Sequence, residues 1–351
     1  MSKPPTSQIL VVTHGKGRGR SVPTGAEFQS QLNRHEPSVA ARLKVHQTGT
    51  PLPDLSHTEL VLFWLGDPLK ESYPSCYAEA VVIASEAELR NIPVINHPNA
   101  LNNTSKSTQA AIWQEVGLPC QPIRTLRSAK DLKTGLKYTP YPCILRSNRD
   151  HAQSAIQILT CKDDAKDIAF DPVLTSAIIP LIDIRAKYRT AGESGLFARF
   201  HHKARAIVAG DKVIASHLFF SKSPIVCQKT SLFSREARPR RTTARRFGFR
   251  SKMLKEVIAA DMAYFNQPVE HADILKHSVK TLGLDVAAVD YSFLPNGEIM
   301  LWEANPYFSL AHGSHSIMST ERDAVSRVDK TFEDLIEVFA NSIPSDERLV
   351  A

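Results

Sequence analysis

The stretch that most constrains the fold of this chain is DYSFLPNGEIMLWEANPYF, residues 290–308. It places Asn296-Gly297 between two apolar runs, the strongest short-range signal for a β-hairpin with a type I′ turn. Because the turn fixes the pairing register of a hairpin, it also predicts which side chains face each other. The pairs expected on the apolar face are Tyr291 with Trp302 and Phe293 with Met300.

The other face of this hairpin carries acids. Asp290 lies directly opposite Glu303 in the predicted register, with Cβ atoms roughly 4.5–5.5 Å apart, and Asn305 faces the same way. Like charges directly opposite destabilise a sheet, so something should offset the repulsion. Two carboxylates and an amide oxygen suit a Mg²⁺ ion that also holds phosphates. The alternatives are acids that face water, or one acid paired with an arginine from elsewhere in the chain.

The N-terminal part of the chain alternates strand-like and helix-like stretches. Short apolar runs typical of buried strands lie at residues 8–13, 59–66 and 92–98. Between them we expect a helix over about 25–34, where Thr24 and Glu27 form a capping-box pattern, and another over 76–90. This alternation predicts a parallel sheet covered by helices.

A second unit begins near Ser105, with a helix that ends at Gly117. The strands predicted after it are residues 141–147, 154–159 and 176–184, the first two paired. A hairpin over 205–220 turns at Gly210-Asp211. The helices predicted in the rest of the chain cover residues 164–169, 251–265, 269–282 and 333–340.

The net charge of +7 is concentrated in one segment. Residues 235–252, REARPRRTTARRFGFRSK, hold seven arginines and one lysine against one glutamate, so the rest of the chain is formally neutral. The segment is interpreted as a loop over an anionic ligand, a nucleic-acid patch or a solvated loop without a partner. Only Phe247 and Phe249 interleave with its basic residues, so a nucleic-acid partner is disfavoured. The glycine-rich stretch HGKGRGR, residues 14–20, is either an anion-binding turn or an ordinary loop.

Cysteine usage and hydropathy predict the compartment of the protein and whether it crosses a membrane. Five cysteines are scattered and form no CxxC pair, which favours a reduced, cytoplasmic protein. The sequence starts MSKPPTSQ, without the apolar core of a signal peptide. No run of 18 or more apolar residues is present, so no membrane partner is expected.

Four stretches in this order resemble the ATP-grasp superfamily, which includes D-alanine–D-alanine ligase, glutathione synthetase and ligases that add glutamate to protein tails. The first stretch, INHPNALNNTSKSTQAAIWQEVGLPCQPIRT, has Lys106 at the family's lysine. YPCILRS has Arg146 where a second phosphate lysine stands, and KARAIVAGDKVIAS has Arg205 at the family's arginine. The last stretch, residues 283–306, matches the family's metal ligands with Asp290, Glu303 and Asn305.

The resemblance implies an architecture. It is an α/β (α+β) ATP-grasp fold with an N-terminal parallel α/β pre-ATP-grasp domain. The implied boundaries are residues 1–104 for that domain, 105–185 for the central subdomain and 186–345 for the C-terminal subdomain that carries the metal site.

The resemblance also implies an activity, an ATP- and Mg²⁺-dependent carboxylate–amine ligase that works through an acylphosphate, with Mn²⁺ as an alternative metal. Its partners would be ATP, a small carboxylate, and an amine or peptide acceptor, for which an acidic peptide is one option. The oligomeric state is left open, with a homodimer among the options. The residues implied are Lys106 and Arg146 for phosphate, the backbone of Leu181, Ile182 and Asp183 for adenine, Arg205 for catalysis, and Asp290, Glu303 and Asn305 for the metal.

The chain departs from the family pattern mainly in its phosphate-binding half. The expected phosphate loop, SNRDHAQSA at 147–155, has no glycine, and Arg146 replaces a lysine point charge with a planar fork. Pro180 stands where an acidic residue is usual beside the adenine, and Ala288 stands where D-alanine ligases have an arginine. The alternative to a ligase is therefore a degenerate, non-catalytic nucleotide-binding protein with a regulatory or partner-binding role. His312 and His315 are expected in a loop near the site.

Overall fold

The computed structural model describes most of the chain. The described residues are 8–15, 37, 41–149, 156–170, 175–185, 200–227, 229–233, 249–294, 296–308, 331, 334, 335 and 338, with only the backbone of 249–254. Some predictions lie outside them: the helix over 25–34, residues 16–20 of the glycine-rich stretch, the side chains of the arginine-rich segment, His312 and His315, and most of the helix over 333–340.

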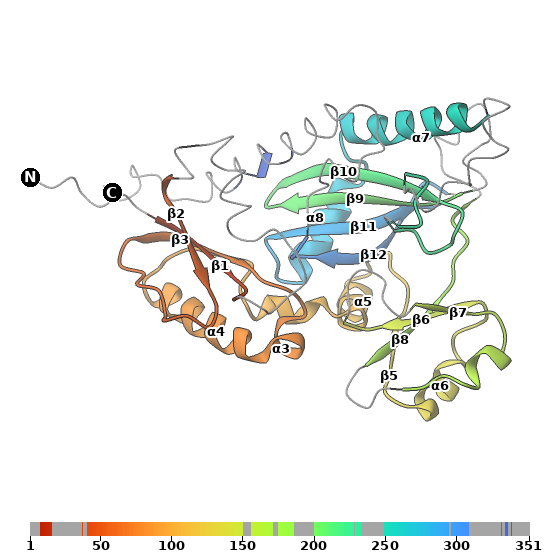
Figure 1. The fold of residues 1–351 in the computed structure, drawn as a ribbon, viewed down its shortest axis with the longest axis horizontal. Coiled ribbons are helices and arrows are strands. Elements are labelled where there is room, and N and C mark those ends of the chain that lie inside the picture. Colours follow the sequence, from red (N-terminus) through yellow and green to blue (C-terminus); the bar gives the residue numbers. More distant parts are fainter. Residues whose placement is uncertain are drawn as a thin grey trace, which may run out of the picture.

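The N-terminal unit is a parallel sheet covered by helices, as predicted (Figure 1). Its strand order is β2 (Leu43–Gln47), β1 (Gln8–Thr13), β3 (Thr58–Trp64) and β4 (Val94–Ile95). Helices α3 (Leu69–Ser72) and α4 (Pro74–Leu89) connect β3 to β4. The sequence reading missed β2, because this edge strand has only two buried residues and no apolar run.

The second unit begins with the 3₁₀ turn η1 (Ala100–Thr104) and helix α5 (Lys106–Glu115), which ends before Gly117 with its left-handed φ of 73°. Its antiparallel sheet has the order β5 (Arg124–Leu126), β8 (Ser176–Pro180), β6 (Cys143–Ser147) and β7 (Gln157–Leu159). The predicted pairing of 141–147 with 154–159 is confirmed by β6 and β7. The sequence reading missed β5 and helix α6 (Ala129–Gly135), and only the 3₁₀ turn η2 (Asp163–Ala165) forms where a helix is predicted.

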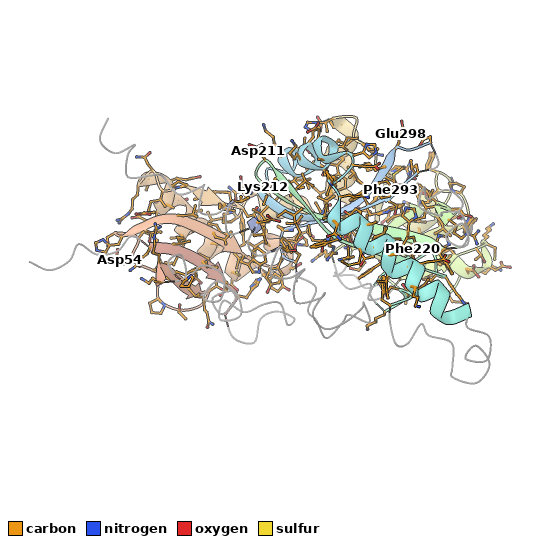
Figure 2. The ribbon with its side chains drawn as sticks, turned by 90° about the horizontal axis from the view of Figure 1, so that it is seen from above. Asp54, Asp211, Lys212, Phe220, Phe293 and Glu298 are labelled. Carbon is orange, nitrogen blue, oxygen red and sulfur yellow. The ribbon has the colours of Figure 1, made fainter. Side chains whose placement is uncertain are left out.

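The third sheet is antiparallel, in the order β10 (Lys212–Ser221), β9 (His201–Ala209), β11 (Val286–Phe293) and β12 (Ile299–Asn305). Helices α7 (Phe249–Asn266) and α8 (Ala272–Thr281) confirm the two helices predicted before it. The β9–β10 turn, with Asp211 and Lys212, lies at the opposite end of the sheet from Glu298 in the β11–β12 turn (Figure 2). None of the described helices combines the length and apolar character that a membrane-spanning segment requires.

The β11–β12 hairpin confirms the predicted pairing of the acids and corrects the pairing of the apolar residues. Asp290 lies opposite Glu303. Nearer the turn, Tyr291 pairs with Leu301 and Phe293 with Ile299, so the predicted partners Trp302 and Met300 are wrong.

Two local features explain this register. Gly297 alone in the described part of the turn has a positive φ, of 88°, and Leu294 donates its N–H to the Glu298 carbonyl over 2.7 Å. The loop is therefore one residue longer than a type I′ turn. A β-bulge between Asp290 and Tyr291 takes up the extra residue and returns the acids to opposite positions. Trp302 lies at this bulge, where its indole N–H donates to Ser292 Oγ over 2.7 Å.

Asn96 joins the N-terminal unit to the third sheet. It is fully buried with a left-handed φ of 56°, directly after β4. Its Oδ1 accepts the backbone N–H groups of Asp285 and Val286, each over 3.0 Å, and its Nδ2 donates to the Val286 carbonyl over 2.9 Å. The side chain thus satisfies the backbone groups at the start of β11 that no strand partner reaches.

We expect Asn96→Ala to lower the free energy of unfolding by about 3 kcal/mol, because it leaves buried N–H groups without an acceptor. Asn91 has the same left-handed backbone, with φ of 57°, but is exposed, so Asn91→Ala isolates the backbone cost, which we expect to be about 1 kcal/mol. Urea unfolding of both variants measures the difference. Equal losses would show that the side-chain hydrogen bonds contribute nothing.

His14, directly after β1, is a half-buried neutral histidine. Its Nε2 accepts the Gly66 N–H over 2.6 Å, and its ring packs 4.5 Å from the Tyr73 ring. Burial lowers its pKa from 6.5 to about 4. The unfolded chain therefore binds a proton at this residue at a higher pH than the folded chain does.

Because the unfolded state binds that proton first, stability should fall as the pH drops from 6.5 towards 4. The loss from this half-buried residue should be about 2 kcal/mol. His14→Gln does not titrate, so its unfolding free energy should fall less steeply across the same window. Urea midpoints measured through the window for both proteins test this, and equal slopes would contradict it.

Candidate functional site

A pocket lies between the second and third sheets. Six of its lining residues come from five different parts of the chain: Lys106 at the start of α5, Ile144 and Arg146 on β6, Leu181 after β8, Lys203 on β9 and Glu303 on β12. The sequence predictions Lys106, Arg146, Leu181, Ile182, Asp290 and Glu303 all line this pocket. The fold therefore brings together residues up to about two hundred positions apart.

Apolar side chains form a large part of the pocket lining, which is called the apolar slot below. Aliphatic side chains of β6 and β8 form one wall, and the segment after β10 and the indole of Trp302 contribute to the lining. The lining residues that build this slot are Ile144, Ile156, Ile179, Pro180, Ile182, Ile225, Val226 and Trp302. An apolar slot between two sheets suits a flat aromatic ring.

The segment after β8 contains the residues predicted to contact adenine, Leu181, Ile182 and Asp183. Leu181 and Ile182 line the pocket, but the Leu181 N–H already donates to the Pro142 carbonyl over 3.0 Å. Asp183 is not among the lining residues. Its carboxylate pairs with Arg185 at 2.6 Å, and this hydrogen bond lowers the pKa of Asp183 to about 2.

Asp290 also lines the pocket, completely buried and held by two cations. Arg205 Nε donates to Oδ1 over 2.6 Å and Nη2 to Oδ2 over 3.0 Å, while Lys203 Nζ reaches Oδ2 at 2.7 Å. Burial alone would raise the pKa of Asp290, but Arg205 and Lys203 hold it well below its usual range. Pairing of one acid with an arginine, one of the three ways of offsetting the opposed acids, is present in the structure.

Glu303 faces the pocket with a looser cationic partner. Its Oε2 lies 3.6 Å from Arg146 Nη2, and its side chain is 16% exposed. Burial alone would raise its pKa, but Arg146 and Lys106 outweigh that effect and bring it to about 2. Glu303 is therefore ionised at neutral pH and retains oxygen lone pairs for a ligand in the pocket.

Asn305 supplies a buried acceptor on the same face of β12 as Glu303. It is 5% exposed, and among the described residues no donor reaches its Oδ1. A buried amide oxygen of this kind favours a ligand that accepts its lone pairs. Glu303 lines the pocket and Asn305 does not, but both offer oxygen atoms of the kind that suits a hard divalent cation such as Mg²⁺. Both oxygens of Asp290 are already held by Lys203 and Arg205.

Asn148 links the two segments that carry Lys106 and Arg146, the cationic side chains predicted to bind phosphate. The Lys106 N–H donates to its carbonyl over 3.1 Å, and the Ser107 N–H donates to its Oδ1 over 3.0 Å. The start of α5 is therefore tied to the residues directly after Arg146. The glycine-less loop itself lies mostly outside the described residues, which include only 147–149 of it.

Gln109 is a site residue that the sequence reading missed. Its Oε1 accepts the Ala304 N–H and its Nε2 donates to the Ala304 carbonyl, each over 2.8 Å. Ala304 stands between Glu303 and Asn305, so Gln109 holds the backbone that carries both predicted ligands. The signal in the sequence is a polar residue one helical turn after Lys106, on the face that buries Trp113.

Lys203 is the second residue missed, and Arg205 is placed differently from expectation. Lys203 lines the pocket, whereas Arg205 does not, although both hold Asp290. The two-residue spacing on one strand could have indicated that both side chains share a face.

Gln109→Ala should lower the free energy of unfolding by about 2–3 kcal/mol, because it leaves the buried Ala304 N–H and carbonyl unpaired. Gln114, exposed on the same helix, is the matched control, and Gln114→Ala should change stability by less than about 0.5 kcal/mol. Thermal and urea unfolding of the two variants provide the measurement. A Gln109→Ala protein as stable as the control would contradict the role of Gln109 as a support for β12.

Comparison with known proteins finds proteins of similar structure but none of similar sequence. No family model matches the chain, and no curated protein matches it. A solved structure of the ATP-grasp ligase PsnB with minimal precursor, Mg and ADP is 12% identical, covers 93% of this chain and 100% of that chain, and has a TM-score of 0.53.

Two further structures are equally similar, each with a TM-score of 0.53. The RimK domain protein ATP-grasp from Sphaerobacter thermophilus DSM 20745 is 12% identical over 94% of this chain and 99% of that chain. D-alanine–D-alanine ligase from Bacillus anthracis is 13% identical over 95% of this chain and 97% of that chain. The chain therefore has the fold of ATP-grasp ligases, and the predicted fold class is confirmed. The domain boundaries and the roles of the site residues stay predictions.

Proposed function

We propose that this protein is an ATP- and Mg²⁺-dependent ligase that joins a carboxylate to an amine through an acylphosphate. The observation that carries the proposal is one pocket whose lining combines an apolar slot with ionised side chains. That combination suits a nucleotide, whose base is flat and apolar and whose phosphates are anionic. The ATP-grasp ligases that share the fold support it, because one of them was solved with Mg and ADP.

The ionised side chains of the site favour a polyphosphate as the ligand. Four cationic side chains surround two carboxylates, which leaves an excess of two positive charges: Lys106, Arg146, Lys203 and Arg205 against Asp290 and Glu303. Lys106 is only 3% exposed, so its charge acts in a medium that screens it weakly. Phosphoryl transfer depends on charge neutralisation and positioning more than on covalent help from the protein. We propose that Lys106 and Arg146 hold phosphate oxygens.

Glu303 and Asn305 would hold the metal ion, which when bound would neutralise charge on the phosphates. Arg205 acts behind the pocket wall, where it keeps Asp290 ionised and in place. We therefore propose that the effect of Arg205 on catalysis runs through Asp290 and Lys203.

The reaction has two steps. A carboxylate oxygen of the substrate attacks the γ-phosphorus, the bond from that phosphorus to the ADP oxygen breaks, and an acylphosphate and ADP result. The amine nitrogen then attacks the acyl carbon, inorganic phosphate leaves, and the amine loses a proton. We propose an amine or peptide as the acceptor, which is supported by the structure of the ATP-grasp ligase PsnB with a precursor peptide.

A second candidate function is nucleotide binding without phosphoryl transfer. It is favoured by the engagement of both Asp290 oxygens with Lys203 and Arg205, which leaves fewer free ligands for metal. ADP release distinguishes the two functions. A ligase should release ADP with one member of a panel of carboxylates and amines, whereas a binding protein should hold ATP and release none.

Calorimetry of ATP binding tests the proposal. The wild type should bind ATP more tightly with Mg²⁺ than without it. Glu303→Ala removes a metal ligand and should lower the affinity in Mg²⁺ by about 10-fold or more. Without Mg²⁺ the same variant should bind ATP at least as tightly as the wild type, because it removes a negative charge beside the phosphates.

The matched control is Glu298→Ala in the exposed turn of the same hairpin, which should leave both affinities unchanged. Equal loss of affinity with and without Mg²⁺ in Glu303→Ala would indicate general damage to the pocket. Absence of ATP binding by the wild type would end the ligase proposal.

A further inference from the structure

The predicted metal ligands differ in how far their oxygen atoms are already engaged by protein partners. Glu303 has one partner, Arg146, at 3.6 Å, and Asn305 Oδ1 has none among the described residues. Asp290 has three short contacts from two cations, 2.6 Å and 3.0 Å from Arg205 and 2.7 Å from Lys203. A site for two divalent cations needs carboxylate oxygens that reach both ions. Here the central carboxylate is already neutralised by the protein.

The pairing of Asp290 is built into the sheet. Asp290 on β11 lies opposite Arg205 on β9 in the backbone register, and Lys203 stands two residues earlier on the same face. Both cations therefore come from the neighbouring strand, at positions that backbone hydrogen bonds define. Releasing either one would leave a desolvated charge, because the Lys203 and Arg205 side chains are only 16% and 21% exposed.

We propose that this pocket takes a single divalent cation with the nucleotide, on Glu303 and Asn305, and that the ammonium of Lys203 occupies the place of a second one. Lys203 lines the pocket while it contacts Asp290, so its positive charge faces both the carboxylate and the phosphates. A fixed ammonium neutralises phosphate charge without a metal-binding equilibrium. This inference rests on the proposed nucleotide site, which it specifies further.

The test counts metal ions in the complex. The protein is saturated with Mn²⁺ and adenylyl imidodiphosphate and passed through a gel-filtration column in buffer that contains both ligands. Bound nucleotide and bound manganese are each measured as the excess above the buffer level in the protein peak. The wild type should hold one manganese per nucleotide. Lys203→Met keeps the length of the side chain but removes the charge, so it should hold two. Lys255→Met, at an exposed position on α7, is the control and should hold one.

Each outcome bears on the inference. Two manganese ions per nucleotide in the wild type would overturn it and leave the ligase proposal intact. One ion in both the wild type and Lys203→Met would also overturn it, because Lys203 would then not be what excludes the second ion. No bound nucleotide in the wild type would overturn the proposed function and this inference together. If Lys203→Met does not fold, the count for the wild type still decides between one ion and two.

Discussion

The structure around the pocket depends on one interaction, the ion pairing of the buried carboxylate of Asp290. A fully buried carboxylate is stable only with cationic or hydrogen-bonding partners, and here Lys203 and Arg205 provide them. Both partners come from β9, so β9 must lie beside β11. The same pairing makes it tolerable for Glu303 to stand directly opposite Asp290 on β12. The same contact therefore couples the electrostatics of the site to the pairing of β9 with β11.

Three side-chain amides join the elements that carry the residues of the site. Asn96 binds the backbone at the start of β11, Gln109 binds the backbone between the predicted ligands on β12, and Asn148 ties the start of α5 to the end of β6. Each amide offers a donor and an acceptor in one rigid group, so it can satisfy backbone groups that no strand or helix partner reaches. The pocket owes its shape to contacts between elements from distant parts of the chain.

In the β11–β12 hairpin the predicted pairing of Asp290 with Glu303 is correct, whereas the partners predicted for Tyr291 and Phe293 are wrong. The turn is longer than the predicted type I′ turn, and a bulge at Asp290 compensates for the added residue. The bulge places Trp302 where its indole reaches Ser292 and lines the pocket. A bulge depends on packing against the rest of the sheet, and no pattern within the hairpin indicates it.

The sequence by itself determined the elements with strong periodicity and clear boundaries. They include the strand at 8–13, the hairpin within residues 290–308, the helices that end at Gly117 and Gly283, and the opposed pair of Asp290 and Glu303. Spacing along the chain carries that information because these features are local. Only the tertiary structure decided that Lys203 and Arg205 hold Asp290, that Gln109 supports β12 and that Asp183 lies outside the pocket lining. Those contacts join residues far apart in sequence, so they form and contribute to stability only when the sheets are assembled.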